Sequence, residues 1–374
     1  MKNNRNSKYG LNLDNTIFVV DSPVTAFMIS ILADGRPVNL LLEKKKGLET
    51  DHASDLLLNF VNSCISIKHM KIVELPHRFY IGGKDLVKIW NIRKETKKLY
   101  DEYDEDAVYV GASTSTFMRS FRRKHENIIY LHHGLTDLIR KEDENKYKKG
   151  LKSRLRSFIV GKIIGLPYST WCNYWPEKAF SLCRLNNENE RWLNLYDFES
   201  KQIENTFKTF SRFADKKNNV LFFPVIEGHV KGGVNSDVTS FDQFNYDFLI
   251  KHIDPENDRI FIKYHPWLYR ANDTTRIDLT EMLNKNGIEA YDIASMIPEE
   301  IGGVLLPTEV ICRFFDFKKM ISMDTSTMWY LSGNKNIIKI IDIRNAPDDY
   351  RDIMVHCIEQ LKVKSDTDDI QFFI

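Results

Sequence analysis

Cysteine is scarce in this sequence of 374 residues, and its five copies are scattered and odd in number. No CxxC pair and no cluster of cysteine with histidine occurs along the chain. A disulfide framework and a zinc site are therefore not predicted, and the pattern is typical of a reducing compartment. The cysteines are Cys64, Cys172, Cys183, Cys312 and Cys357.

Long hydrophobic runs and strong net charge are also absent. No run of 18 apolar residues occurs, so no membrane-spanning helix is expected. The first ten residues are polar and basic, with no apolar stretch behind them, and no signal peptide is predicted. The formal net charge is +1, which gives no reason to expect a nucleic-acid partner. A hydrophobic content of 43% and a charged content of 28% are typical of a soluble globular protein.

The common nucleotide-binding motifs are missing as well. No GxGxxG follows the first predicted strand, and no GxxxxGK[ST] occurs. A glycine-rich stretch does run from Gly228 to Gly233, but it lacks the spacing of either motif. Ordinary dinucleotide binding and nucleotide hydrolysis by a P-loop are therefore disfavoured.

What the chain does contain is a regular alternation of strand-like and helix-like stretches. Apolar runs at 15–20, 37–42, 70–75, 106–111 and 127–131 predict strands, with helical patterns between them. A second series has strands at 219–225, 259–264, 288–292, 319–323 and 337–341. We predict an α/β chain of two Rossmann-like domains that face a central cleft. The expected division is an N-terminal domain (1–170), a connecting region (171–215), a C-terminal domain (216–345) and a terminal helix and tail (346–374).

Polar groups follow several of these strands, at the edge where parallel sheets bind ligands. Two such stretches fall in the first domain and two in the second. Serine and threonine at these places also cap helices, which is the alternative interpretation for each stretch. The four stretches are Ser113-Thr114-Ser115-Thr116, His132-His133-Gly134, His265-Pro266 and Thr325-Ser326-Thr327.

Together these groups suit a donor that contains a phosphate. Hydroxyl and N–H groups at the start of a helix near Thr327 would face an anion, assisted by the helix dipole. His265 could donate a hydrogen bond to the same phosphate, worth roughly 1.5–3 kcal/mol. In the other domain, His133 or His132 could take a proton from an attacking hydroxyl. Glu309 could accept hydrogen bonds from a ribose diol, or it could simply stabilise the start of its helix.

Three motifs, in this order, resemble those of the bacterial sialyltransferases and capsular polysialyltransferases. They are Tyr264-His265-Pro266, Leu306-Pro307-Thr308-Glu309-Val310 and Asp324-Thr325-Ser326-Thr327. The resemblance implies a GT-B fold and inverting transfer of an acidic sugar from a CMP-activated donor. The sugar would be sialic acid, and the acceptor a galactose-type hydroxyl of a bacterial O-antigen or capsule, which we expect to be lipid-linked.

The same resemblance implies roles for single residues. His265 would stabilise or protonate the departing CMP phosphate, Thr325, Ser326 and Thr327 would hold that phosphate, and Glu309 would hold the ribose. No cofactor and no metal is expected, because CMP carries one phosphate and no DxD motif follows a strand. Pro266 and Gly228 complete the expected donor side, and the acceptor or donor-sugar side comprises Gly134, Asp137, Ser113, Thr114 and Ser115.

One departure from the family concerns the general base. The family has an acidic pair before the glycine, whereas this chain has His132-His133. A carboxylate of that pair deprotonates the acceptor in the family. A histidine can do the same work, and Asp137 is a nearby substitute.

Two other classes remain open from the sequence. A His-Gly pair followed by His-Pro and a Ser/Thr motif also resembles the CDP-glycerol and CDP-ribitol phosphotransferases of teichoic-acid synthesis, and a CMP-Kdo-dependent transferase is a further alternative. The Pro-x-Glu feature at Pro307 and Glu309 favours the sialyltransferases. The third possibility is a module that binds a glycan or nucleotide without catalysis.

A basic amphipathic stretch runs from Lys146 to Ile164. Its apolar residues fall on one helical face, so it could lie on an anionic membrane surface. The alternative is a core-packed helix with a solvated basic face. We expect a cytoplasmic protein that associates peripherally with the inner face of the membrane. The positive residues are Lys146, Lys148, Lys149, Lys152, Arg154, Arg156 and Lys162.

Overall fold

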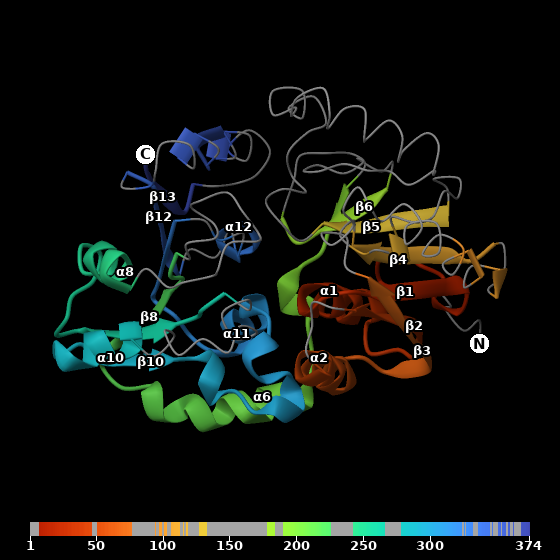
Figure 1. The fold of residues 1–374 in the computed structure, drawn as a ribbon, viewed down its shortest axis with the longest axis horizontal. Helices are drawn as coiled ribbons and strands as arrows, with labels where there is room; N and C mark the ends of the chain where they lie inside the picture. The colour runs from red at the N-terminus through yellow and green to blue at the C-terminus, as the bar shows by residue number, and fades with distance from the viewer. Residues whose placement is uncertain are drawn as a thin grey trace. The chain divides into compact units, whose positions relative to one another are not determined.

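A computed structural model gives the fold, drawn as a ribbon in Figure 1. It describes residues 7–46, 51–76, 106–112, 127–132, 178–183, 190–225, 242–265, 278–323, 327–331 and 336–344. It also describes 94, 97–98, 101–102, 115, 117–118, 325, 346, 351–352, 354–356, 358–359, 362 and 368–374. The chain divides into a first unit, Met1–Ser54 with Cys64–Glu199, and a second unit, Asp55–Ser63 with Ser200–Ile374.

The first unit is built on a seven-stranded parallel sheet with the order β3-β2-β1-β4-β5-β6-β7. The order reverses between β1 and β4, and in such sheets ligands bind beyond the carboxyl ends of the strands at this point. The strands are β1 (Thr16–Val20), β2 (Val38–Lys46), β3 (Ile67–Pro76), β4 (Val108–Ala112), β5 (Ile128–His132), β6 (Ala179–Ser181) and β7 (Glu190–Trp192). Its helical elements include η1 (Leu13–Asn15), α1 (Pro23–Ala33), the ends of α2 (Asp51–Cys64) and η7 (Leu195–Asp197).

Two local features, a capping serine and a proline, fix the start of helix α1. The side chain of Ser22 accepts a hydrogen bond from the N–H of Thr25, and Pro23 fills the first helical position, where no N–H is needed. Thr25 also donates its hydroxyl to Asp21, at 2.7 Å, just after β1. The helix ends at Ala33 and is capped by Asp34, whose φ of 53° lies in the left-handed region. These contacts fix the turn that follows β1.

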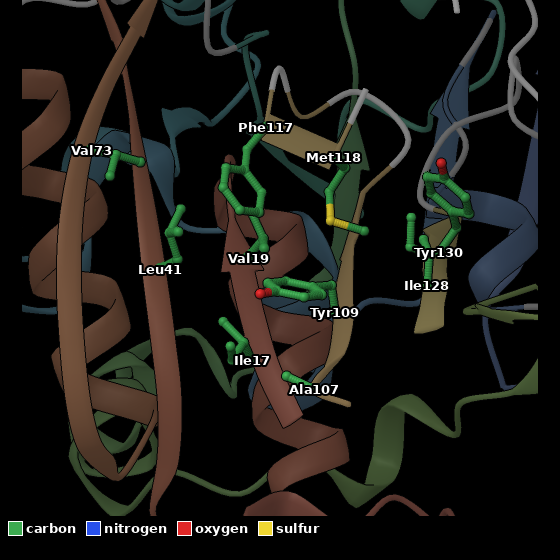
Figure 2. Close-up of a cluster of buried hydrophobic side chains, with 10 residues drawn as sticks. All are labelled: Ile17, Val19, Leu41, Val73, Ala107, Tyr109, Phe117, Met118, Ile128 and Tyr130. Atoms are coloured by element: carbon green, nitrogen blue, oxygen red, sulfur yellow. The ribbon is translucent and has the colours of Figure 1, made fainter. Parts of the chain in front are cut away.

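The core of the first unit contains a cluster of buried side chains, which Figure 2 shows. Ile17 and Val19 alternate along β1, so they point to the same face of the sheet. Phe117 and Met118, which follow β4, pack over this face. Gly111 allows Val19 and Met118 to pack closely against β4, because a Cβ at this position would lie 2.9 Å from Val19 Cβ and 3.0 Å from Met118 Cγ. The other members are Leu41, Val73, Ala107, Tyr109, Ile128 and Tyr130.

The second unit has a six-stranded parallel sheet with the order β10-β9-β8-β11-β12-β13. Here the order reverses between β8 and β11. The strands are β8 (Asn218–Phe222), β9 (Asp258–Ile262), β10 (Ala290–Asp292), β11 (Lys319–Ser322), β12 (Ile338–Asp342) and β13 (Ile370–Phe373). The helices are α6 (Lys201–Lys208), α8 (Asp242–Leu249), α10 (Asp278–Lys285), α11 (Thr308–Phe314) and α12 (Thr327–Tyr330), with η8 (Thr209–Phe213), η10 (Ala294–Met296), η11 (Glu299–Ile301) and η12 (Gly303–Leu305).

The prediction of an α/β chain with two Rossmann-like domains, the pattern of the GT-B fold, is confirmed. The division of the chain differs from the expected one. Strands β6 and β7 and η7 belong to the first unit, although 171–215 was expected to be a connecting region. Strand β13 extends the second sheet, although 346–374 was expected to hold only a helix and tail. Strands of three or four residues are too short to show a periodic pattern.

Helix α2 is the other exception to a simple division. It connects β2 to β3 of the first sheet, but its residues 55–63 belong to the second unit. Within that unit, Asn59 donates its side-chain N–H to the carbonyl of Glu299 at 3.0 Å. Ser200 donates its hydroxyl to the carbonyl of Ser63 at 2.7 Å.

Among the described residues, no helix is long and apolar enough to cross a membrane. The predicted membrane-surface segment, 146–164, lies outside the described residues.

Candidate functional site

The ends of three strands in the second unit lie level with one another. Ile262 of β9 pairs with Phe222 of β8, which pairs with Ile321 of β11. His265 follows Ile262 by three residues, and Thr325 follows Ile321 by four. The two predicted donor-side motifs therefore leave the same edge of the sheet, at the point where its strand order reverses.

Glu309 and Thr327 are joined at this edge. Thr327 donates its hydroxyl to the carboxylate of Glu309 at 2.9 Å, and both side chains are buried. Glu309 is the second residue of α11, and Thr327 is the first residue of α12. A hydrogen bond to a buried charged group is worth roughly 1.5–3 kcal/mol. The Pro-x-Glu motif and the Ser/Thr motif thus form one connected group.

The turn around Thr325 is held in a similar way. The N–H of Thr327 donates to the hydroxyl oxygen of Thr325 at 3.4 Å, while the side chain of Thr325 stays partly exposed. Helix α12 is only four residues long. Its dipole is therefore small, and an anion at this turn would depend on hydroxyl and N–H groups.

Lys263 lies between β9 and the segment that carries Glu309. Its backbone N–H donates to the carbonyl of Phe222 at 2.9 Å, and its ammonium donates to the carbonyl of Val304 at the same distance. The side chain is 5% exposed. Burial lowers the pKa of Lys263 to about 8, although the charges of Asp292 and Glu309 act to raise it.

Two consecutive glycines bring the Val304 carbonyl to this lysine. Gly302 and Gly303 have φ values of 106° and 52°, in the region that disfavours other residues. A Cβ at Gly302 would lie 2.9 Å from Phe60 Cβ, so the close packing of α2 also requires glycine. The turn from η11 to η12 therefore depends on these two positions.

His265, the predicted leaving-group residue, stands three residues beyond β9 and is partly exposed. The strand ends at Ile262, two residues earlier than the sequence predicts. The remaining donor-side residues predicted from the sequence, Pro266, Ser326 and Gly228, lie outside the described residues.

In the first unit, the structure describes two of the predicted site residues. His132 is the last residue of β5 and is 3% exposed. Ser115 is buried after β4, where its hydroxyl donates to Glu43 at 2.7 Å and accepts from the N–H of Met118. Ser115 thus has the helix-capping contact that the sequence left as an alternative. Ser113, Thr114, His133, Gly134 and Asp137 lie outside the described residues.

No family model matches the chain, and no curated protein matches it. Among solved structures, the chain is similar to a substituted form of the wall teichoic acid polymerase TagF, with 11% identity and a TM-score of 0.41. That match covers 88% of this chain and 70% of the other. A second similarity is to the Escherichia coli ADP-heptose lps heptosyltransferase II, with 10% identity, a TM-score of 0.34, and 88% and 85% coverage. The function proposed below is supported by the residues of this chain alone.

The structure adds residues that the sequence did not single out. Lys263 ends an apolar run, and Glu43 follows the apolar run of β2; both are charged and buried. A charged residue directly after an apolar run is the signal in the sequence that points to them, because a charge that becomes buried there requires partners. Glu43 accepts from Ser115 and from the N–H of Phe117, at 3.1 Å. Lys263 contacts the carbonyl of Val304, in the segment that leads to Glu309.

Metal ligands do not gather in the part of the chain that the structure describes. No group of three or more histidine, cysteine, aspartate or glutamate side chains there could hold an ion. Asp368 and Asp369 precede β13; Lys339 donates a hydrogen bond to Asp369.

Proposed function

We propose that the chain is an inverting glycosyltransferase of the GT-B type that uses a CMP-activated acidic sugar, with sialic acid as the sugar. The observation that supports this most is the hydrogen bond between Glu309 and Thr327. It joins two motifs of the resemblance, 18 residues apart, at the sheet edge that His265 also leaves. The acceptor is a galactose-type hydroxyl of a bacterial surface glycan.

The donor side follows from these groups. The CMP phosphate lies against the turn from Thr325 to Thr327, and the ribose diol donates hydrogen bonds to Glu309. His265 is partly exposed at the strand end and donates a proton or hydrogen bond to the departing phosphate. The donor contains one phosphate and no pyrophosphate, so the reaction requires hydrogen-bond donors at that single phosphate only.

The transfer balances as a single displacement. The acceptor oxygen forms a bond to the anomeric carbon of the sugar, and the bond from that carbon to the phosphate oxygen breaks. The acceptor proton passes to a base in the first unit, and CMP leaves with the bonding electrons. His132 is buried within β5, which favours His133 or Asp137 as the base.

A donor screen tests this proposal. Purified protein is incubated with CMP-sialic acid, CMP-Kdo, CDP-glycerol or CDP-ribitol and a galactosyl acceptor, and the products are analysed. Of the four donors, we expect only CMP-sialic acid to give a new glycosidic bond and free CMP. A glycosidic product from CMP-Kdo instead would keep the transferase class and change the sugar.

A polyol phosphotransferase is the second candidate, favoured by His132-His133-Gly134 followed by His265-Pro266. Phosphorus in the product of the CDP-glycerol or CDP-ribitol reaction would decide for it. Binding of CMP without turnover of any donor would favour a module that only binds. In that case changing both His132 and His133 would leave CMP affinity unaltered.

A further inference from the structure

Lys263 is a buried cation that none of the three motifs of the resemblance includes. Its side chain runs from the end of β9 to the carbonyl of Val304 in η12, at 2.9 Å. His265 lies two residues further along the same strand exit, and Glu309 lies five residues beyond Val304. Lys263 therefore bridges the two segments that carry the proposed leaving-group residue and the proposed ribose ligand.

The surroundings of Lys263 are strongly charged. Asp292, at the end of β10, and Glu309, at the start of α11, both attract its ammonium. Asp292 also accepts hydrogen bonds from the backbone N–H groups of Ala294 and Ser295. Burying a lysine is costly unless opposite charges and hydrogen bonds compensate for the lost water.

The charge matters for an anionic ligand. Glu309 lies in the first turn of α11 and is hydrogen-bonded to Thr327, in the turn proposed to hold the CMP phosphate, and a carboxylate there repels a phosphate. An ammonium at Lys263 offsets this repulsion, and it also favours the ionised form of Glu309, which is the form that accepts two hydrogen bonds from a diol.

We propose that Lys263 is a positioning residue for the nucleotide donor. Its ammonium ties strand β9 to the segment that carries Glu309 and balances the carboxylate charge, so that Glu309 and Thr327 meet the nucleotide in one fixed arrangement. This inference rests on the proposed function, because it concerns the same donor site.

A double-mutant cycle tests the proposal with the full chain. Lys263→Met, Glu309→Gln and the double variant are compared with the wild type for CMP affinity by calorimetry and for KM and kcat with CMP-sialic acid. We expect Lys263→Met to weaken CMP binding and raise KM by about tenfold or more, the loss of one charge-assisted contact, with a smaller effect on kcat. In the Glu309→Gln background the same change should cost little, because the two residues act together.

A control cycle uses an exposed ion pair of the same unit. Lys285 contacts Glu281 at 2.7 Å on the surface of α10. Lys285→Met and Glu281→Gln should leave CMP affinity unaltered, since exposed pairs contribute little. Lys263→Gln is a second variant at the site, because an amide can still donate to Val304 without carrying charge. If charge balance is the role of Lys263, this variant weakens CMP binding as Lys263→Met does, even where its thermal unfolding matches that of the wild type.

The pH profile adds a measurement that a purely structural role would not alter. As pH rises through about 8, Lys263 loses its proton, and CMP affinity of the wild type should fall. The groups that face Lys263 include the carboxylates of Asp292 and Glu309 and the Val304 carbonyl. In Lys263→Met the alkaline fall should disappear.

The outcomes separate the inference from the proposed function. If the wild type neither binds CMP nor uses a CMP donor, the proposed function fails and the inference fails with it. If the wild type binds CMP but the two changes are additive, or Lys263→Met and Lys263→Gln bind CMP as tightly as the wild type, the inference alone is overturned. The inference is supported if the losses of CMP affinity are non-additive and the fall in affinity at alkaline pH disappears in Lys263→Met.

Discussion

The hydroxyl of Thr327 donates to the carboxylate of Glu309 at 2.9 Å, and the two residues are 4% and 3% exposed, respectively. A buried carboxylate that loses such a donor remains charged, but the hydrogen bond no longer offsets the free-energy cost of removing the charge from water. The contact therefore serves both the stability of the second unit and the arrangement of the proposed donor site.

Replacement of Thr327 by valine tests this contact. The shape is nearly kept while the hydroxyl is lost, so we expect the free energy of unfolding to fall by about 1–3 kcal/mol and the donor KM to rise. Thr209→Val is the control, because Thr209 is exposed and donates only to the Thr206 carbonyl of its own chain turn. Urea unfolding and donor kinetics check both variants, and equal stabilities for the two would contradict the importance of the contact.

Gly302 offers a test of the turn that presents Val304. Alanine there must adopt a φ of 106° and place its Cβ 2.9 Å from Phe60 Cβ. Gly287 also has a positive φ, 77°, but no heavy atom lies within 4 Å of its added Cβ. Gly302→Ala should therefore be less stable than Gly287→Ala by about 1–3 kcal/mol, the usual effect of overpacking. Thermal or urea unfolding would measure it, and similar losses at both positions would show that the backbone angle alone matters.

His252 should make the second unit sensitive to acid. Its ring lies 2.9 Å from Asp342 and is buried beside Phe248 and Phe373. Burial lowers the pKa of His252, and the positive charges of Arg344 and Lys319 act in the same direction, whereas Asp342 acts to raise it. The folded chain thus binds this proton less readily than the unfolded chain does, and stability falls as pH falls below the ordinary value of 6.5.

His252→Gln removes this titration while keeping an N–H donor near Asp342. We expect the wild type to lose more stability than His252→Gln between pH 7.5 and pH 5.5. His69→Gln, at an exposed position of β3, should behave as the wild type does. Urea unfolding at the two pH values measures the difference. A pH dependence that His252→Gln leaves unaltered would exclude His252 as its source.

The basic segment 146–164 gives a prediction about location. Neutralising Lys148, Lys149, Arg154 and Arg156 should release the protein from membranes, because each basic residue near an anionic surface contributes about 1 kcal/mol. Flotation with vesicles that contain anionic lipid would measure it, with neutral vesicles as the comparison. Retention of the fourfold variant on anionic vesicles would point to another surface.

Much of the fold could be predicted because most strands are apolar runs bounded by turn residues. The run 15–20 anticipates β1, and Pro23 marks the start of α1. Strands β6 and β7 could not be predicted, since three residues give no periodicity. Strand β13, with four residues, is too short for the same reason.

The site shows a similar contrast. His265, Glu309 and Thr327 stand in short motifs that sequence can display. The sheet register brings the segments of His265 and Thr327 to one edge, and a hydrogen bond links Glu309 to Thr327. The pairing of Glu309 with Thr327 could not be foreseen, because it depends on how α11 and α12 pack. Nor could the contact of Lys263 be foreseen, since it is made with the backbone carbonyl of Val304, which follows two glycines.

The most direct test of the proposed transferase is CMP release by purified protein from CMP-sialic acid with and without a galactosyl acceptor. The wild type should release CMP well above the rate of donor hydrolysis only when the acceptor is present, and His265→Ala should lose most of this activity while His69→Ala keeps it. Release no faster than hydrolysis, or full activity in His265→Ala, would contradict the account.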